Sequence, residues 1–153
     1  GALARGDMAF GAFEGDLLVG YSWRTFTAAH HRDSLWHRVE RPYFCGFKAF
    51  TRESHRGRRI HAAVALFSDA YLLDRGYTAE VGFVDIENFA SLGVARHLGR
   101  RRIGYAGYVK WFGRYITFRT PAVKAIGAEL FERDRQFAAT AGATSPTRQG
   151  FHH

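Results

Sequence analysis

An arginine-rich turn stands directly before an amphipathic segment in the middle of the chain. It reads Arg-Gly-Arg-Arg at residues 56–59, and the residues after it carry apolar side chains with a helical period. The first turn of a helix offers backbone N–H groups and the positive end of the helix dipole, and both stabilise a bound anion. The sequence therefore predicts a pyrophosphate-binding turn. The alternative is an ordinary basic helix N-terminus, which three arginines disfavour because they oppose the dipole.

A polar residue, Asn88, follows the strand expected over residues 78–84. An asparagine at the end of a strand can hydrogen-bond an extended amide chain such as pantetheine. Asparagine is also a common helix cap, and that role explains the residue without any ligand. Gly99 stands eleven residues later and is expected to end a helix over residues 89–98. Both interpretations of Asn88 remain open.

Together, the turn and the asparagine resemble the acyl-CoA site of the GCN5-related N-acetyltransferase superfamily, over roughly residues 8–119. The phosphate loop of that family has the pattern Gln/Arg-x-x-Gly-x-Gly/Ala. Alignment on Arg56 puts Arg59 where glycine is usual and His61 where glycine or alanine is usual, so this loop is degenerate. A lost glycine removes room for phosphate beside the backbone. The guanidinium of Arg59 can compensate by a bidentate phosphate contact.

The second family motif, Asn-x-x-Ala/Ser followed by an apolar helix face and Lys-Leu-Gly-Phe, is better kept. Asn88, Ser91 and Gly99 stand at the family's spacing, while Arg100 replaces its phenylalanine. Ala95 occupies the position of a tyrosine that often protonates the leaving thiolate in this family. The resemblance thus implies acyl-CoA binding without that acid.

The resemblance implies an N-acyltransferase that uses acetyl-CoA or another acyl-CoA as co-substrate and a small-molecule or peptide amine as acceptor. The acceptor attacks the thioester directly, strand amides polarise the carbonyl, and a nearby base removes a proton. The two candidate bases are Glu80 and Tyr105, for which a strand-end ion pair and a packed aromatic ring are the favoured alternatives. The expected cofactor-binding residues are Phe50, Thr51, Arg56, Gly57, Arg58, Arg59, Ile60, His61, Asn88 and Ser91.

The pattern of elements predicts an α/β domain over residues 1–137, with a mixed, mainly antiparallel sheet and a central strand–helix–strand crossover. A polar tail over residues 138–153 is expected to be disordered. The family's first strand and two helices have no counterpart before Gly1. The expected strands span residues 8–13, 17–28, 42–51, 78–84, 103–112 and 115–118; the expected helices span 60–75 (with Gly76 as its stop), 89–98 and a segment from Thr120 that carries Val123, Ile126, Leu130 and Phe131; residues 30–41 are expected to form a loop.

Composition sets the remaining expectations. Lys and Arg exceed Asp and Glu by 22 to 14, and the excess clusters at residues 52–59 and 96–102, which indicates a polyanionic partner. Solvated faces of an arginine-rich protein are the alternative, and for the second cluster the two interpretations remain equally open. Two alternatives follow: an acyltransferase that takes its acyl group from an acidic acyl carrier protein, and a non-catalytic basic module for nucleic acid, which no known DNA- or RNA-recognition motif supports.

The single Cys45, the lack of a long apolar run and the lack of a signal peptide predict a cytoplasmic protein. Histidine spacing predicts no metal site, and a homodimer is compatible with the resemblance.

Overall fold

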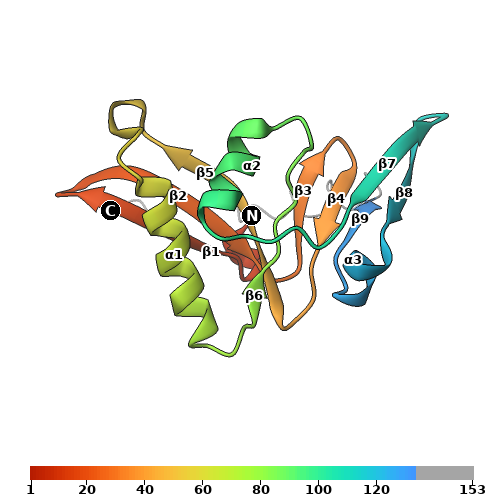
Figure 1. The fold of residues 1–153 in the computed structure, drawn as a ribbon, viewed down its shortest axis with the longest axis horizontal. Coiled ribbons are helices and arrows are strands. Elements are labelled where there is room, and N and C mark those ends of the chain that lie inside the picture. The colour runs from red at the N-terminus through yellow and green to blue at the C-terminus, as the bar shows by residue number, and fades with distance from the viewer. Residues whose placement is uncertain (134–153) are drawn as a thin grey trace, which may run out of the picture.

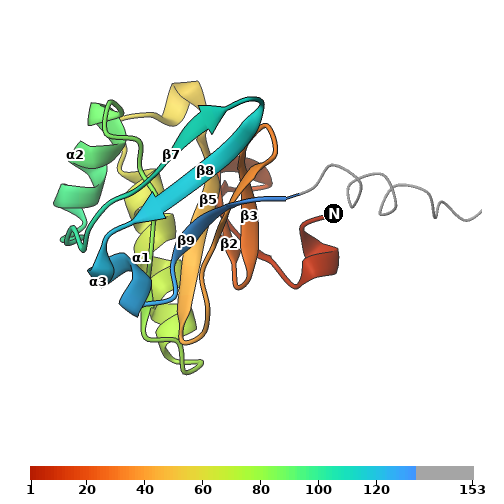
Figure 2. The same cartoon turned by 90° about the vertical axis from the view of Figure 1, so that its right-hand side faces the viewer.

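The computed structural model describes residues 1–133, so the tail expected at 138–153 lies outside the described part. Strands form three sheets, ordered β1-β2-β5-β6, β3-β4-β9 and β7-β8. The α-helices gather on one side of the strands, as the view in Figure 2 shows. In chain order the elements are η1 (Leu3–Arg5), β1 (Met8–Glu14), β2 (Leu17–Thr25), β3 (Ala28–Arg32), β4 (Leu35–Arg38), β5 (Tyr43–Thr51), η2 (Glu53–His55), α1 (Ile60–Leu73), β6 (Ala79–Glu80), α2 (Phe89–His97), β7 (Ala106–Trp111), β8 (Arg114–Arg119), α3 (Pro121–Ala125) and β9 (Glu129–Glu132).

The first sheet confirms the predicted hairpin and the mixed α/β class. β1 and β2 pair antiparallel around the turn at Gly15, which has φ +59°. β2 then pairs antiparallel with β5, and β5 pairs in parallel with β6 across the crossover helix α1. The strand–helix–strand unit expected from the alternating pattern is therefore present.

β5 and β6 run together for only a short distance. Their register pairs Tyr43 with Ala79 and Phe44 with Glu80, and the amide of Val81 donates to the Phe44 carbonyl at 2.8 Å. β5 then continues to Thr51, while the chain after Val81 leaves it and leads to α2; Figure 1 shows this divergence. The strand predicted over residues 78–84 is thus paired only at its start.

Helix α1 packs one face against the sheet and leaves another open. Val64 and Leu72 join Phe10 and Phe44 in a buried cluster between α1, β1 and β5. Phe67, which the helical period places on the apolar face, is 65% exposed. Among residues 1–133 no helix is long and apolar enough to cross a membrane.

The loop predicted over residues 30–41 is wrong, because most of it forms the hairpin of β3 and β4. The turn at Asp33 has φ +47°, and Leu35 and His37 point inward from β4. A histidine at a buried position disguises the alternation that marks a strand. β4 also gains a second partner in β9, a segment far away in the sequence.

The long C-terminal helix predicted from Thr120 is also wrong. α3 ends at Ala125, and Gly127 follows with φ +70°, the left-handed conformation that closes a helix. Leu130 and Phe131 lie instead in β9, where they pair with His37 and Trp36 of β4. Apolar residues at helical spacing were therefore divided between a short helix and a strand.

A buried ionic network joins the crossover unit to the segment after α2. The guanidinium of Arg24 is 2% exposed, donates to Ser22 and Ser68, and lies 3.9 Å from the Glu80 carboxylate. Arg100 bridges that carboxylate to Asp69 on α1. A Cβ at Gly46 would overlap Glu80, so the carboxylate packs directly on the β5 backbone. The network therefore fixes α1 and the end of α2 relative to β2, β5 and β6.

Candidate functional site

The arginine-rich turn adopts an open, left-handed conformation before α1. Gly57 has φ +76°, Arg59 has φ +57°, and Arg59 is the N-cap residue of the helix. The helix begins with a hydrogen bond from the Ala63 amide to the Arg59 carbonyl at 3.0 Å. Within the described chain no side chain caps this end. The first-turn amides thus remain available to an anion.

A carboxylate from the β1–β2 hairpin steadies the approach to this turn. The Oε2 atom of Glu14 lies 2.8 Å from Nε2 of His55, and its Oε1 atom accepts from Arg58 at 3.1 Å. Hydrogen bonds from His55 and then Arg58 hold the pKa of Glu14 below its usual value. Arg58 is therefore turned to the hairpin, whereas Arg56 pairs loosely with the exposed Glu53 at 3.7 Å.

Between the turn and α2 lies a cavity of about 430 Å³, here called the loop pocket. Its lining residues are Thr51, His55, Arg56, Gly57, Arg59, Ile60, His61, Ala62, Gly93, Val94, His97 and Leu98. A Cβ at Gly57 would meet no atom within 4 Å, so no side chain blocks the backbone there. Burial lowers the pKa of His61, so its ring is neutral near neutral pH and the arginines supply the positive charge.

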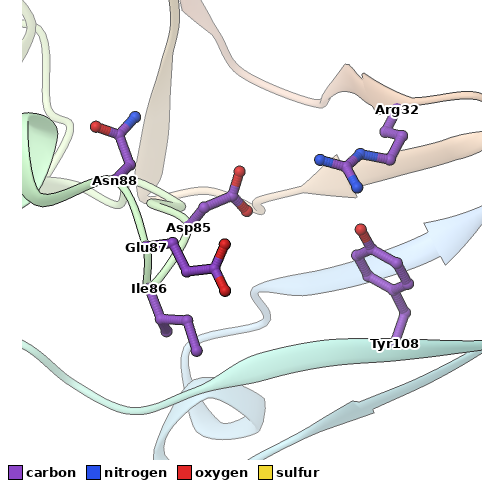
Figure 3. A pocket seen from close by; sticks show the side chains of 6 residues that line it. All are labelled: Arg32, Asp85, Ile86, Glu87, Asn88 and Tyr108. Atoms are coloured by element: carbon purple, nitrogen blue, oxygen red, sulfur yellow. The ribbon is translucent and has the colours of Figure 1, made fainter.

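A second cavity of about 420 Å³, here called the charged pocket, lies beside the start of α2. In Figure 3, Arg32 and Tyr108 stand on one side of it and Asp85 and Glu87 on the other. It is lined by Arg32, Asp85, Ile86, Glu87, Asn88 and Tyr108. Nε2 of His31 lies 4.0 Å from Oδ1 of Asp85.

The structure brings six of the expected cofactor residues together in the loop pocket and separates the others. Asn88 lines the charged pocket, and its side chain accepts a hydrogen bond from the Ser91 amide at 3.0 Å, the helix-cap geometry. Phe50 stacks on Tyr21 at the end of β5 and is 44% exposed. The six in the loop pocket are Thr51, Arg56, Gly57, Arg59, Ile60 and His61.

The two candidate bases lie outside both pockets. Glu80 is held by Arg100 and lies beside Arg24, which is the ion-pair alternative considered for it. The hydroxyl of Tyr105 accepts from Arg102 at 2.7 Å, and the ring is half exposed rather than packed. Within residues 1–133 no group of three or more His, Cys, Asp or Glu side chains is arranged to hold a metal ion.

Sequence reasoning missed residues in both pockets. Gly93 and Val94 lie one helical turn before His97 on α2, a spacing that could have marked a second wall of the loop pocket. Asp85 and Glu87 stand in the segment that follows β6 and leads to α2, and segments after the carboxyl ends of strands often form ligand sites in α/β folds. Arg32 gave no signal, because its segment was taken for a loop.

Comparison with solved structures places this arrangement among known folds. The aminoglycoside N-acetyltransferase AAC(6')-Iy, solved with a bisubstrate analogue of CoA and acetylneamine, superposes with a TM-score of 0.51 at 17% identity, over 63% of each chain. A putative acetyltransferase from Agrobacterium tumefaciens also gives 0.51 at 17% identity, over 67% of this chain and 69% of that one. This protein has the fold of the GCN5-related N-acetyltransferases. The match spans less than two thirds of AAC(6')-Iy, and no protein-family profile or curated protein sequence matches the chain.

The fold explains why glycine is usual at the position of Arg59. This residue has φ +57°, a conformation that costs a non-glycine residue about 1–2 kcal/mol. Arg59→Gly is therefore expected to raise the free energy of unfolding by about 1 kcal/mol in urea denaturation. Arg58→Gly is the comparison variant, because Arg58 does not have a positive φ; glycine there relieves no strain, loosens the turn and removes the exposed contact with Glu14, so stability should fall. Equal effects of the two substitutions would contradict strain at Arg59.

Proposed function

We propose that this protein is an N-acyltransferase that transfers an acyl group, most simply acetyl, from acyl-CoA to an amine. The neutral amine nitrogen forms a bond to the thioester carbonyl carbon while the carbon–sulfur bond breaks. The amine gives up a proton to a base or to water, and CoA leaves as a thiolate that takes up a proton. Direct attack needs both substrates bound together, and the fold offers two pockets, one before and one along α2, to hold them.

The observation that carries this proposal is the loop pocket. Its open turn presents uncapped first-turn amides beside Arg56 and Arg59, the combination that suits the diphosphate of CoA. Thr51 and Ile60 extend the pocket along the ends of β5 and α1. The acetyltransferase fold supports the same assignment.

The proposal keeps the six expected cofactor residues that line the loop pocket and assigns proton transfer to neither candidate base. Glu80 is engaged by Arg100, and Tyr105 by Arg102, so each would have to leave its partner to act as a base. A water molecule or a side chain at the charged pocket serves the same purpose without that cost.

Calorimetric titration tests the donor. Acetyl-CoA is expected to bind with micromolar or tighter affinity, and Arg56→Ala should weaken binding about 10-fold by removing a charge-assisted hydrogen bond. Acetylpantetheine, which lacks the diphosphate, should bind far more weakly than acetyl-CoA, and Arg56→Ala should leave that weak affinity unchanged. Arg114→Ala, on the far hairpin and 81% exposed, is the matched control. Equal affinity for the two thioesters would exclude diphosphate binding at the turn.

The same samples separate the two alternatives inferred from charge. No affinity for acetyl-CoA together with salt-sensitive binding of an acyl-loaded carrier protein would move the donor to that partner. Tight, steeply salt-dependent binding of DNA or RNA without thiol release would indicate a binding module instead.

A further inference from the structure

The charged pocket carries opposite charges on opposite walls. Figure 3 shows the guanidinium of Arg32 across the cavity from the carboxylates of Asp85 and Glu87, with the hydroxyl of Tyr108 on the same side as Arg32 and turned toward it. The walls come from separate parts of the fold: β3 and β7 on one side, and the segment between β6 and α2 on the other. Tertiary structure has thus assembled donors and acceptors around one space.

The charged groups of the two walls do not form ion pairs with one another. In the part of the chain that the structure describes, no ion pair or side-chain hydrogen bond engages Arg32, Glu87 or the Tyr108 hydroxyl, and Asp85 has only His31 at 4.0 Å. Neighbouring charges do pair: Asp33, next to Arg32, accepts from Tyr115 at 2.5 Å and lies 3.7 Å from Lys110. Arg32 therefore remains available to a ligand while the adjacent residue is committed to the fold.

One continuous stretch of chain contributes to the lining of both pockets. Residues 85–88 line the charged pocket, and Gly93, Val94, His97 and Leu98 of the following helix line the loop pocket. A ligand in the charged pocket consequently lies against the residues that lead into α2, the helix that walls the proposed acyl-CoA site. Of the two pockets described, the charged pocket is therefore the candidate acceptor site.

We infer that the acceptor is a zwitterion, an amino acid or short peptide, with its amine at Asp85 and Glu87 and its carboxylate at Arg32 and Tyr108. Guanidinium binds carboxylate bidentately, and a phenol hydroxyl donates a further hydrogen bond. Two carboxylates bind an ammonium group and hold it at the pocket until it passes a proton to water or to one of these carboxylates, and the neutral nitrogen then attacks the thioester carbonyl carbon. A cavity of about 420 Å³ holds a ligand of this size. This inference rests on the proposed acyl-CoA reaction and adds the class of its acceptor.

An assay of thiol release from acetyl-CoA by the full chain tests this inference. The acceptors are free α-amino acids, ω-amino acids of increasing length and dipeptides, and each is compared with its carboxamide. The best free acid is expected to exceed its carboxamide at least about 10-fold in kcat/KM, because one charge-assisted contact is worth about that factor. Arg32→Gln should lower kcat/KM for the free acid about 10-fold and bring the ratio near unity. Arg38→Gln, on the neighbouring strand and paired with Glu129, is the matched control and should keep the wild-type ratio.

Equal turnover of acids and carboxamides, or a preference that survives Arg32→Gln, would overturn the inference. So would failure of every free acid to react or to bind while acetyl-CoA still binds, and that result would leave the donor assignment intact. Absence of acetyl-CoA binding, measured on the same protein, would instead contradict the proposed function.

Discussion

Arg24→Met is expected to lower the free energy of unfolding by about 3–5 kcal/mol, because it removes one member of a buried charge network and leaves the others uncompensated. The guanidinium of Arg24 is 2% exposed and contacts Ser22, Ser68 and Glu80. Burial and the neighbouring Glu80 already raise the pKa of Asp69 despite its pairing with Arg100. Losing a second cation leaves two carboxylates sharing one arginine. Urea denaturation at neutral pH, followed by circular dichroism, measures the change.

The control for this prediction removes an arginine from a solvated pair. Arg114 lies 3.8 Å from Glu132 with 81% of its side chain exposed, so Arg114→Met should change stability little. A loss for Arg24→Met no larger than that for Arg114→Met would show that the buried charges carry no stability. The double variant Arg24→Met with Glu80→Gln should recover part of the loss, since it removes the unpaired anion as well.

Local sequence signals predicted the elements that build the loop pocket. The turn at Gly15, the helical period after residue 59 and the cap at Asn88 each act within a few residues, and the structure confirms the hairpin, α1 and α2. The resemblance at residues 56–61 placed Arg59 at a glycine position, and its backbone has the left-handed conformation that glycine adopts readily. Six of the expected cofactor residues consequently share one cavity.

Contacts between segments far apart in the sequence could not be predicted in the same way. β4 became a strand because it pairs with β9, more than ninety residues later, and no local pattern announces that partner. The charged pocket depends on a second long-range contact, since β3 carries Arg32 to the segment at Asp85. The error at β9 and the omission of Arg32 thus share a cause, because each required knowing which distant segments of the chain lie together.

The buried His37 is expected to make stability depend on pH. Its ring is 6% exposed and stacks on Phe83, and within residues 1–133 neither ring nitrogen has a hydrogen-bond partner. Burial, followed by the neighbouring His31 and His30, lowers its pKa from 6.5 to about 4. The unfolded chain therefore binds a proton more readily than the folded one below pH 6.5. Stability from the neutral ring is present above that pH and is lost as pH falls toward 4.

This difference of pKa predicts that His37 alone costs about 2 kcal/mol of stability between pH 7 and pH 5, and about 3 kcal/mol once the pH is below 4. His37→Phe keeps an aromatic ring against Phe83 but cannot bind a proton, so its urea midpoint should fall less than that of the wild type over the same pH range. His97→Phe, which removes an exposed histidine from α2, is the matched control. Equal pH dependence in the two variants would mean that the ring on β4 is protonated without opening the core. That result would show that the β3–β4–β9 sheet, which carries Arg32 of the charged pocket, is not the acid-sensitive part of the fold.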